Sequence, residues 1–207
     1  MMSMYKQSLF IRNLLLMGVT GLFVACGASM VEVSGSYPVP NVNKVPISLA
    51  VYYDDALRDF IYTEFSETGQ EEYNILSGQS HVDLFNAVLP AMFQQVVEVG
   101  SMEEAAILDV DAVFAPTIEE FQLALPYKTK LEVFEVWIKY NMRLVSPEGD
   151  YIADWVTTSY GKTEDRSLTS NESSINEAAY EALRDLGSTF VLSFDQVPEV
   201  RDWLASR

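Results

Sequence analysis

One long run, from Leu131 to Val145, constrains the fold of this chain more than any other feature. Within it, apolar residues at the even positions from Phe134 to Leu144 alternate with mostly polar residues at the odd positions. Successive residues of a strand point to opposite faces of a sheet, so the pattern predicts a long β-strand with one apolar and one polar face. A turn at 147–150 and a second strand from Tyr151 to Tyr160 would complete a long β-hairpin.

Shorter patterns predict the other elements. Strand composition recurs in four segments, 47–53, 72–76, 96–99 and 112–123. Apolar residues at helical spacing follow four start signals, at Asp54 or Asp55, Ser80, Ser174 and Pro198. The first helix would carry Leu57, Phe60 and Ile61 on one side, and the helix at Ser174 an apolar stripe from Ile175 to Phe194. Pro90 should kink or divide the second helix, and Pro116 favours a sheet edge or a bulge. The order predicts a single α/β (α+β) domain over 45–207, with helices packed on a mixed, largely antiparallel sheet that contains the one long β-hairpin.

The first 25 residues have the pattern of a leader. Lys6 and Arg12 precede an apolar run from Leu14 to Ala25, and no acidic residue occurs before it. A short transmembrane helix over Asn13 to Val31 is an alternative that glycine and hydroxyl residues weaken. An ordinary secretory leader with a chance cysteine is another.

Phe23-Val-Ala-Cys26 resembles the lipobox of bacterial lipoproteins, although Phe23 stands where leucine is usual. The resemblance implies that 1–25 is a lipoprotein signal peptide and that Cys26, the one cysteine of the chain, receives diacylglycerol and further acyl chains such as palmitate. Two or three acyl chains give a stable membrane anchor. Gly27, in place of a retention aspartate, implies the periplasmic face of the outer membrane. Residues 26–44, rich in small residues and proline, are expected to form a flexible tether from lipidated Cys26.

The formal net charge of −17 argues against nucleic acid and against electrostatic docking on anionic lipid, because both need basic residues. The carboxylates occur mainly as solvated pairs without the pattern of a calcium loop, so neither a metal nor a cofactor is expected.

Residues that could carry catalysis are few. His81 is the single histidine and lies near a helix start, where a structural role is more common; Asp83 would be its orienting carboxylate. Ser159 and Lys162 have a Ser-x-x-Lys spacing, but on a strand they would point to opposite faces. We therefore expect no enzyme, and rank a periplasmic hydrolase using Ser159 or His81 last.

Trp137 and Trp155 both occupy odd positions of the predicted hairpin strands. They are candidate partner contacts on its polar face, and the alternative is that they pack beneath a helix.

The arrangement resembles Gram-negative envelope lipoproteins that include the accessory lipoproteins of curli and Pel-exopolysaccharide secretion and the front domain of TolB. Three segments suggest it: Val45-Pro-Ile-Ser-Leu-Ala-Val51, Asp111-Ala-Val-Phe-Ala-Pro-Thr-Ile118 and Ala178-Ala-Tyr-Glu-Ala-Leu183. The resemblance implies a non-enzymatic outer-membrane lipoprotein that assembles with envelope or secretion proteins or with its own copies. The alternative is a periplasmic carrier that binds a lipid or other apolar ligand between sheet and helices.

Overall fold

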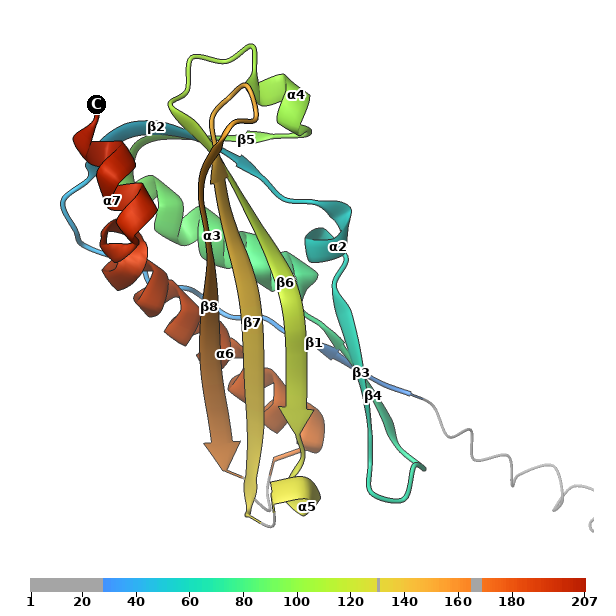
Figure 1. Cartoon of the computed structure of the whole chain (residues 1–207). Coiled ribbons are helices and arrows are strands. Elements are labelled where there is room, and N and C mark those ends of the chain that lie inside the picture. The colour runs from blue at the N-terminus through green and yellow to red at the C-terminus, as the bar shows by residue number, and fades with distance from the viewer. Residues whose placement is uncertain (1–27, 130, 165–168) are drawn as a thin grey trace, which may run out of the picture.

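The computed structural model describes residues 28–129, 131–164 and 169–207 as a single α+β unit with two mixed sheets (Figure 1). The main sheet has the order β5-β2-β6-β7-β8 and the small sheet the order β1-β4-β3. The strands are β1 (Ser29–Glu32), β2 (Val45–Tyr52), β3 (Ile61–Phe65), β4 (Glu72–Leu76), β5 (Phe93–Val99), β6 (Ala112–Ala124), β7 (Val133–Val145) and β8 (Tyr151–Glu164). The helices are α2 (Asp55–Arg58), α3 (Gly78–Met92), α4 (Met102–Ala105), α5 (Pro126–Thr129), α6 (Asn171–Ser193), the 3-10 turn η1 (Phe194–Gln196) and α7 (Pro198–Ala205).

The predicted fold class is confirmed by the pairing of these strands. β2 is parallel to both of its neighbours, β5 and β6. The successive pairs β6–β7 and β7–β8 are antiparallel. The long hairpin is β7–β8, and the even residues of β7 from Phe134 to Leu144 are buried, as the alternation predicts. Pro116 lies beyond Phe114, where the pairing of β6 with β2 ends, so β6 has an open edge on that side.

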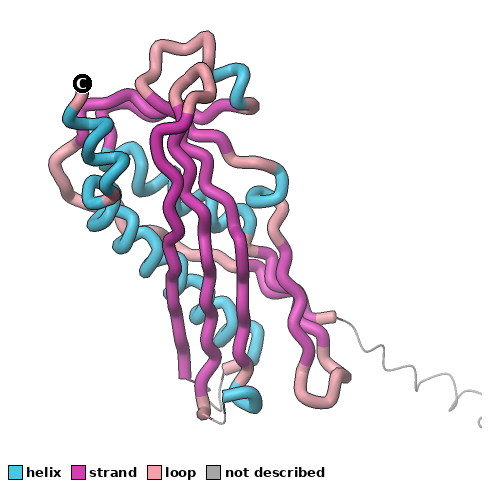
Figure 2. The backbone as a smooth tube through the Cα atoms, viewed as in Figure 1, coloured by secondary structure: helices cyan, strands magenta, loops and turns pink. Residues whose placement is uncertain are grey.

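The helices α3 and α6 lie behind the main sheet in Figures 1 and 2 and cover its apolar face. Aromatic side chains fill the layer between them, and Phe114 contacts both Phe85 and Phe190, with ring centroids 5.5 and 5.2 Å apart. All three side chains are almost fully buried. Such burial contributes about 2 kcal/mol or more per large apolar side chain, so this layer is the main source of stability.

Small residues let α6 approach the sheet closely. A Cβ atom on Gly161 of β8 would lie only 2.2 Å from the Ala178 carbonyl oxygen and from the Ala182 backbone nitrogen. The backbone of α6 therefore rests directly on β8, and no larger residue than glycine fits at this crossing.

The segment predicted as a flexible tether differs from the prediction from Ser29 onward. β1 adds to the small sheet parallel to β4, and Val31, Val33 and Tyr37 are buried. The Ser34 backbone N–H donates to Asn176 Oδ1 at 2.9 Å. Alternating valines in Met-Val-Glu-Val gave this segment strand character, and the free edge of β4 gave it a place to pair.

Three further details of the prediction are wrong. The helix after Asp54 ends at Arg58, and Ile61–Phe65 forms β3 because its alternating side chains pair with β4. The second helix is not divided at Pro90; it ends two residues later, and β5 follows at once. The two long helices begin earlier than predicted, after Ser77 and Ser170, of which only Ser170 caps its helix with the side chain. Among the described residues no helix is long and apolar enough to span a bilayer.

Candidate functional site

The predicted lipidation site, Cys26, precedes the first described residue, Ala28, so its chemistry remains a prediction from the sequence. Trp137 and Trp155, the predicted contact residues, both lie in the described hairpin. The register of the hairpin decides what each can do.

Trp137 and Tyr160 form an exposed aromatic pair on the outer face of the main sheet. They are direct partners across β7 and β8, their ring centroids lie 5.1 Å apart, and 38% and 37% of their surfaces are exposed. The Tyr160 hydroxyl donates to Glu135 Oε1 at 2.8 Å. In Figure 1 this face is turned toward the viewer, and α4 packs against it only at the end near Val113 and Val145, away from the aromatic pair. We call the outward-facing side of β7 and β8 around Trp137 and Tyr160 the aromatic face.

Polar side chains surround the aromatic pair. A shallow depression of about 280 Å³ beside Trp137 is lined by Glu120, Gln122, Lys139 and Thr158. The Lys139 ammonium lies 2.5 Å from a Glu119 carboxylate oxygen, and that carboxylate raises the pKa of Lys139. An aromatic centre bordered by polar side chains and an ion pair is typical of protein contact surfaces, in which the rim excludes water from the anchor.

Trp155 belongs to the opposite face. It pairs with Met142, a buried even position of β7, so the odd residues of β8 face inward while those of β7 face outward. Its ring packs on Phe190 and Phe194 of the helical layer, with centroids 6.4 and 6.1 Å apart. The alternative of packing beneath a helix therefore holds for Trp155, which is not part of the aromatic face. Tyr160, the partner of Trp137 on that face, was not predicted, because alternation within one strand does not give the register between two strands.

His81 is part of the core. Its Nδ1 lies 2.8 Å from the Tyr140 hydroxyl and its Nε2 lies 3.0 Å from Ser77 Oγ. Complete burial lowers the pKa of His81 to about 3, so the ring is neutral at ordinary pH. Asp83, the predicted orienting carboxylate, instead accepts a hydrogen bond from Gln79. The ring therefore joins α3 to β7 and has no access to a substrate.

Ser159 and Lys162 are separated as their strand positions predict. Ser159 is buried and its Oγ has no hydrogen-bond partner, whereas Lys162 is exposed on the other face of β8. Ser159 and Lys162 therefore do not face one another on β8. In the described part of the chain no three histidine, cysteine, aspartate or glutamate residues are grouped as a metal site would require.

An apolar groove lies on the outer side of the two long helices. It has a volume of about 290 Å³, and Leu84 and Val88 of α3 face Val191 and Leu192 of α6 across it, with Pro38 and Pro40 at its border. The predicted carrier cavity would instead lie between sheet and helices, where the aromatic layer fills the space.

Comparison with known proteins shows the fold alone. No family model matches the chain, and no curated protein matches it in sequence. The chain is similar to protein XCC0632 from Xanthomonas campestris, described with the family model DUF330, at 13% identity and a TM-score of 0.51 over 84% of this chain and 95% of that one.

Two lipoproteins match with lower scores. The minor lipoprotein from Acinetobacter baumannii is 9% identical, with a TM-score of 0.41 over 73% of this chain and 94% of that one. The uncharacterized lipoprotein B from Nitrosomonas europaea is 13% identical, with a TM-score of 0.41 over 82% and 97%. The resemblance to curli and Pel accessory lipoproteins and to TolB stays a prediction. The chain thus has a fold similar to that of XCC0632, and its activity has to be argued from its own residues.

Proposed function

We propose that this protein is a non-enzymatic lipoprotein of the Gram-negative envelope that acts as an interaction component of an envelope or secretion complex. The observation that carries the proposal is the exposed Trp137–Tyr160 pair on the outer face of the main sheet. The lipobox-like sequence at Cys26 supplies the envelope location.

The aromatic face has the physical properties of a binding anchor. A tryptophan that becomes fully buried at an interface contributes about 2 kcal/mol or more, and Trp137 still has surface to lose. Partial burial and the neighbouring Glu135 carboxylate raise the pKa of Tyr160 to about 12, so its hydroxyl stays protonated and keeps donating to Glu135. The pair is thus held in place before a partner arrives, which lowers the entropic cost of binding.

A lipid anchor on Cys26 would place the aromatic face near its partners. Acyl chains on Cys26 would hold the domain at the periplasmic face of the outer membrane. In that location the partners would be envelope or secretion proteins or further copies of the chain.

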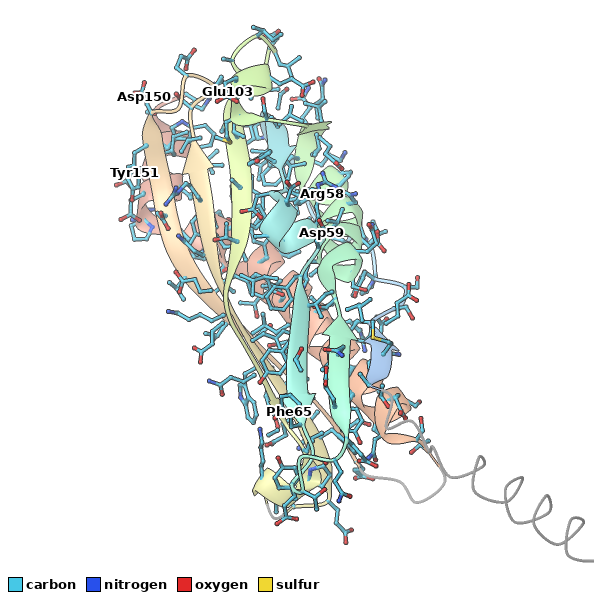
Figure 3. The ribbon with its side chains drawn as sticks, turned by 90° about the vertical axis from the view of Figure 1, so that its right-hand side faces the viewer. Arg58, Asp59, Phe65, Glu103, Asp150 and Tyr151 are labelled. Carbon is cyan, nitrogen blue, oxygen red and sulfur yellow. The ribbon has the colours of Figure 1, made fainter. Side chains whose placement is uncertain are left out.

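Affinity purification of the native lipoprotein from membranes, followed by mass spectrometry, tests the interaction role. The parent and Tyr151→Ala should recover the same protein, because Tyr151 is exposed at the turn end of the hairpin (Figure 3) and β8 separates it from Tyr160. Trp137→Ala should lose about tenfold or more of it, as expected for an interface anchor. Equal recovery with Trp137→Ala, or recovery of nothing above background by the parent, would contradict the proposal.

Separate experiments test the anchor. Cys26→Ser should move the protein from the membrane fraction to the soluble fraction and abolish palmitate incorporation. A Cys26→Ser protein that stays on membranes as firmly as the parent would show that the anchor is elsewhere.

The groove between α3 and α6 favours a second candidate function, the carriage of a lipid or other apolar ligand. Its lining is mostly apolar, as ligand sites are. Val191→Trp should fill the groove and remove any lipid that co-purifies with the parent, whereas Val156→Trp on the aromatic face should not. A parent protein without extractable lipid would remove this candidate.

A further inference from the structure

The short distance in sequence between Cys26 and the folded domain restricts how the domain can stand on a membrane. β1 begins at Ser29, three residues after Cys26, and its first residue is already fixed. Ser29 Oγ donates to Glu172 Oε1 at 2.8 Å, and Ser29 pairs with Tyr73 in the parallel ladder. The Val33 backbone N–H donates to the Leu76 carbonyl at 2.9 Å.

Three residues span at most about 10 Å when fully extended. A lipid on Cys26 would therefore hold Ser29 close to the bilayer surface, and the surroundings of Ser29 would be the part of the domain nearest to the lipid. Those surroundings are the small sheet β1-β4-β3.

The outer face of this sheet, the anchor-side face, exposes three large apolar residues. Met30 of β1 is 60% exposed, and Ile61 and Phe65 of β3 are 54% and 49% exposed. The register places them on one face, because Met30 stands opposite Asn74, which stands opposite Thr63, the residue between Ile61 and Phe65. Figure 3 looks onto this sheet, with Phe65 near the end of the sheet at which β1 begins.

The polar residues among them suit the headgroup region of a bilayer. Thr63 Oγ1 donates to Asn74 Oδ1 at 2.6 Å, and Asn74 Nδ2 donates to Glu72 Oε1 at 2.9 Å, so these groups satisfy one another. The Glu32 and Glu72 carboxylates match the ammonium groups of zwitterionic lipids and would be repelled by anionic ones.

We infer that the anchor-side face rests on the bilayer that holds the anchor, with Met30, Ile61 and Phe65 at the boundary between headgroups and acyl chains. This inference rests on the proposed lipidation of Cys26. The aromatic face belongs to the other sheet and is turned in a different direction in Figures 1 and 3, so it stays open to a partner.

Fluorescence quenching on vesicles tests this orientation. The lipidated full chain is reconstituted into vesicles of phosphatidylethanolamine and phosphatidylcholine. Its native thiol is consumed by the lipid, so a single introduced cysteine carries the fluorophore. Ile61→Cys is matched with Val156→Cys, since both native side chains are 54% exposed, and Phe65→Cys is matched with Tyr151→Cys at the far end of the molecule.

Headgroup-labelled quencher lipids should quench the probes at 61 and 65 at least about twofold more strongly than those at 156 and 151, as expected for residues in the interface. Equal quenching at all four positions on vesicles that float with the protein would overturn the inferred orientation and leave the anchor intact. Protein that does not float with vesicles, and whose native thiol reacts with dye, would instead overturn the proposed lipidation.

Discussion

The Tyr140 hydroxyl lies 2.8 Å from His81 Nδ1 in the centre of the protein, and both side chains are completely buried. This contact connects β7 with α3, and the other ring nitrogen of His81 is hydrogen-bonded to the Ser77 hydroxyl. A buried polar group that has lost its partner costs more free energy than its hydrogen bond contributes when formed. The single histidine is therefore a stability element with measurable consequences.

Tyr140→Phe should lower the free energy of unfolding by about 1–3 kcal/mol, because it removes the partner of His81 Nδ1 and keeps the ring. Urea denaturation measures this change. Tyr160→Phe is the matched control, since its exposed hydroxyl bonds to Glu135 and its loss should cost less than about 0.5 kcal/mol. Equal losses in the two variants would show that the buried Tyr140–His81 contact contributes no more stability than the exposed hydrogen bond.

The pH dependence of stability should report His81. Its pKa in the folded protein, about 3, lies below its ordinary value of 6.5, so below pH 6.5 the unfolded chain binds a proton that the folded chain does not. The neutral, buried His81 therefore costs no stability above pH 6.5. Below pH 6.5 it lowers the free energy of unfolding by about 1.4 kcal/mol per pH unit as the pH drops toward 3. Urea denaturation at pH 7.5, 6 and 5 should show this slope in the parent and a smaller one in His81→Gln. Parallel slopes would show that His81 titrates normally.

Patterns confined to one segment predicted most of the fold. The alternation of β7 gave both its length and its buried face, and the spacing from Ile175 to Phe194 gave the buried stripe of α6 and η1. The elements that were missed depend on partners distant in the sequence. β1 is a strand only because β4 offers it an edge, and β3 became a strand through its hairpin with β4 although helical spacing was expected through Ile61.

The candidate site was predicted only in part, for a similar reason. Because both residues have odd numbers, Trp137 and Trp155 were predicted to share the polar face of the hairpin. The pairing of Met142 with Trp155 places the two tryptophans on opposite faces. The length of the turn between the strands decides that register, and composition does not reveal it. Tyr160 became visible as the neighbour of Trp137 only when the strands were paired.

Substitution of the two tryptophans should affect stability to different degrees. Trp155→Ala should lower the free energy of unfolding by about 2–4 kcal/mol, because it leaves a void against Phe190 and Phe194. Trp137→Ala should cost less than about 1 kcal/mol and should reduce partner recovery, since its ring faces solvent. Thermal or urea unfolding of both variants checks this, and the reverse order would show that the assigned register is wrong.

Gly161→Ala should destabilise the protein although the change adds only a methyl group. The new Cβ would collide with the backbone of α6 at Ala178 and Ala182, so the helix would have to move, at a cost of about 1–3 kcal/mol. Gly100→Ala is the control, because its new Cβ would lie 3.5 Å from the Glu104 carboxylate, which is an ordinary contact distance. A neutral Gly161→Ala variant would indicate that α6 does not rest on β8 as closely as described.

Hydrogen exchange should show that the segment after Cys26 belongs to the folded domain. The amides of Val33 and Ser34 donate to Leu76 and Asn176, so they should exchange about 10²-fold or more slowly than those of the exposed stretch 41–44 in the same molecule. Asn176→Ala should remove most of the protection at Ser34, whereas Ser188→Ala, at an exposed site on the same helix, should leave it unchanged. If residues 29–34 exchange as fast as 41–44, the segment is the flexible tether that its composition predicts, and the restricted orientation at the membrane no longer follows.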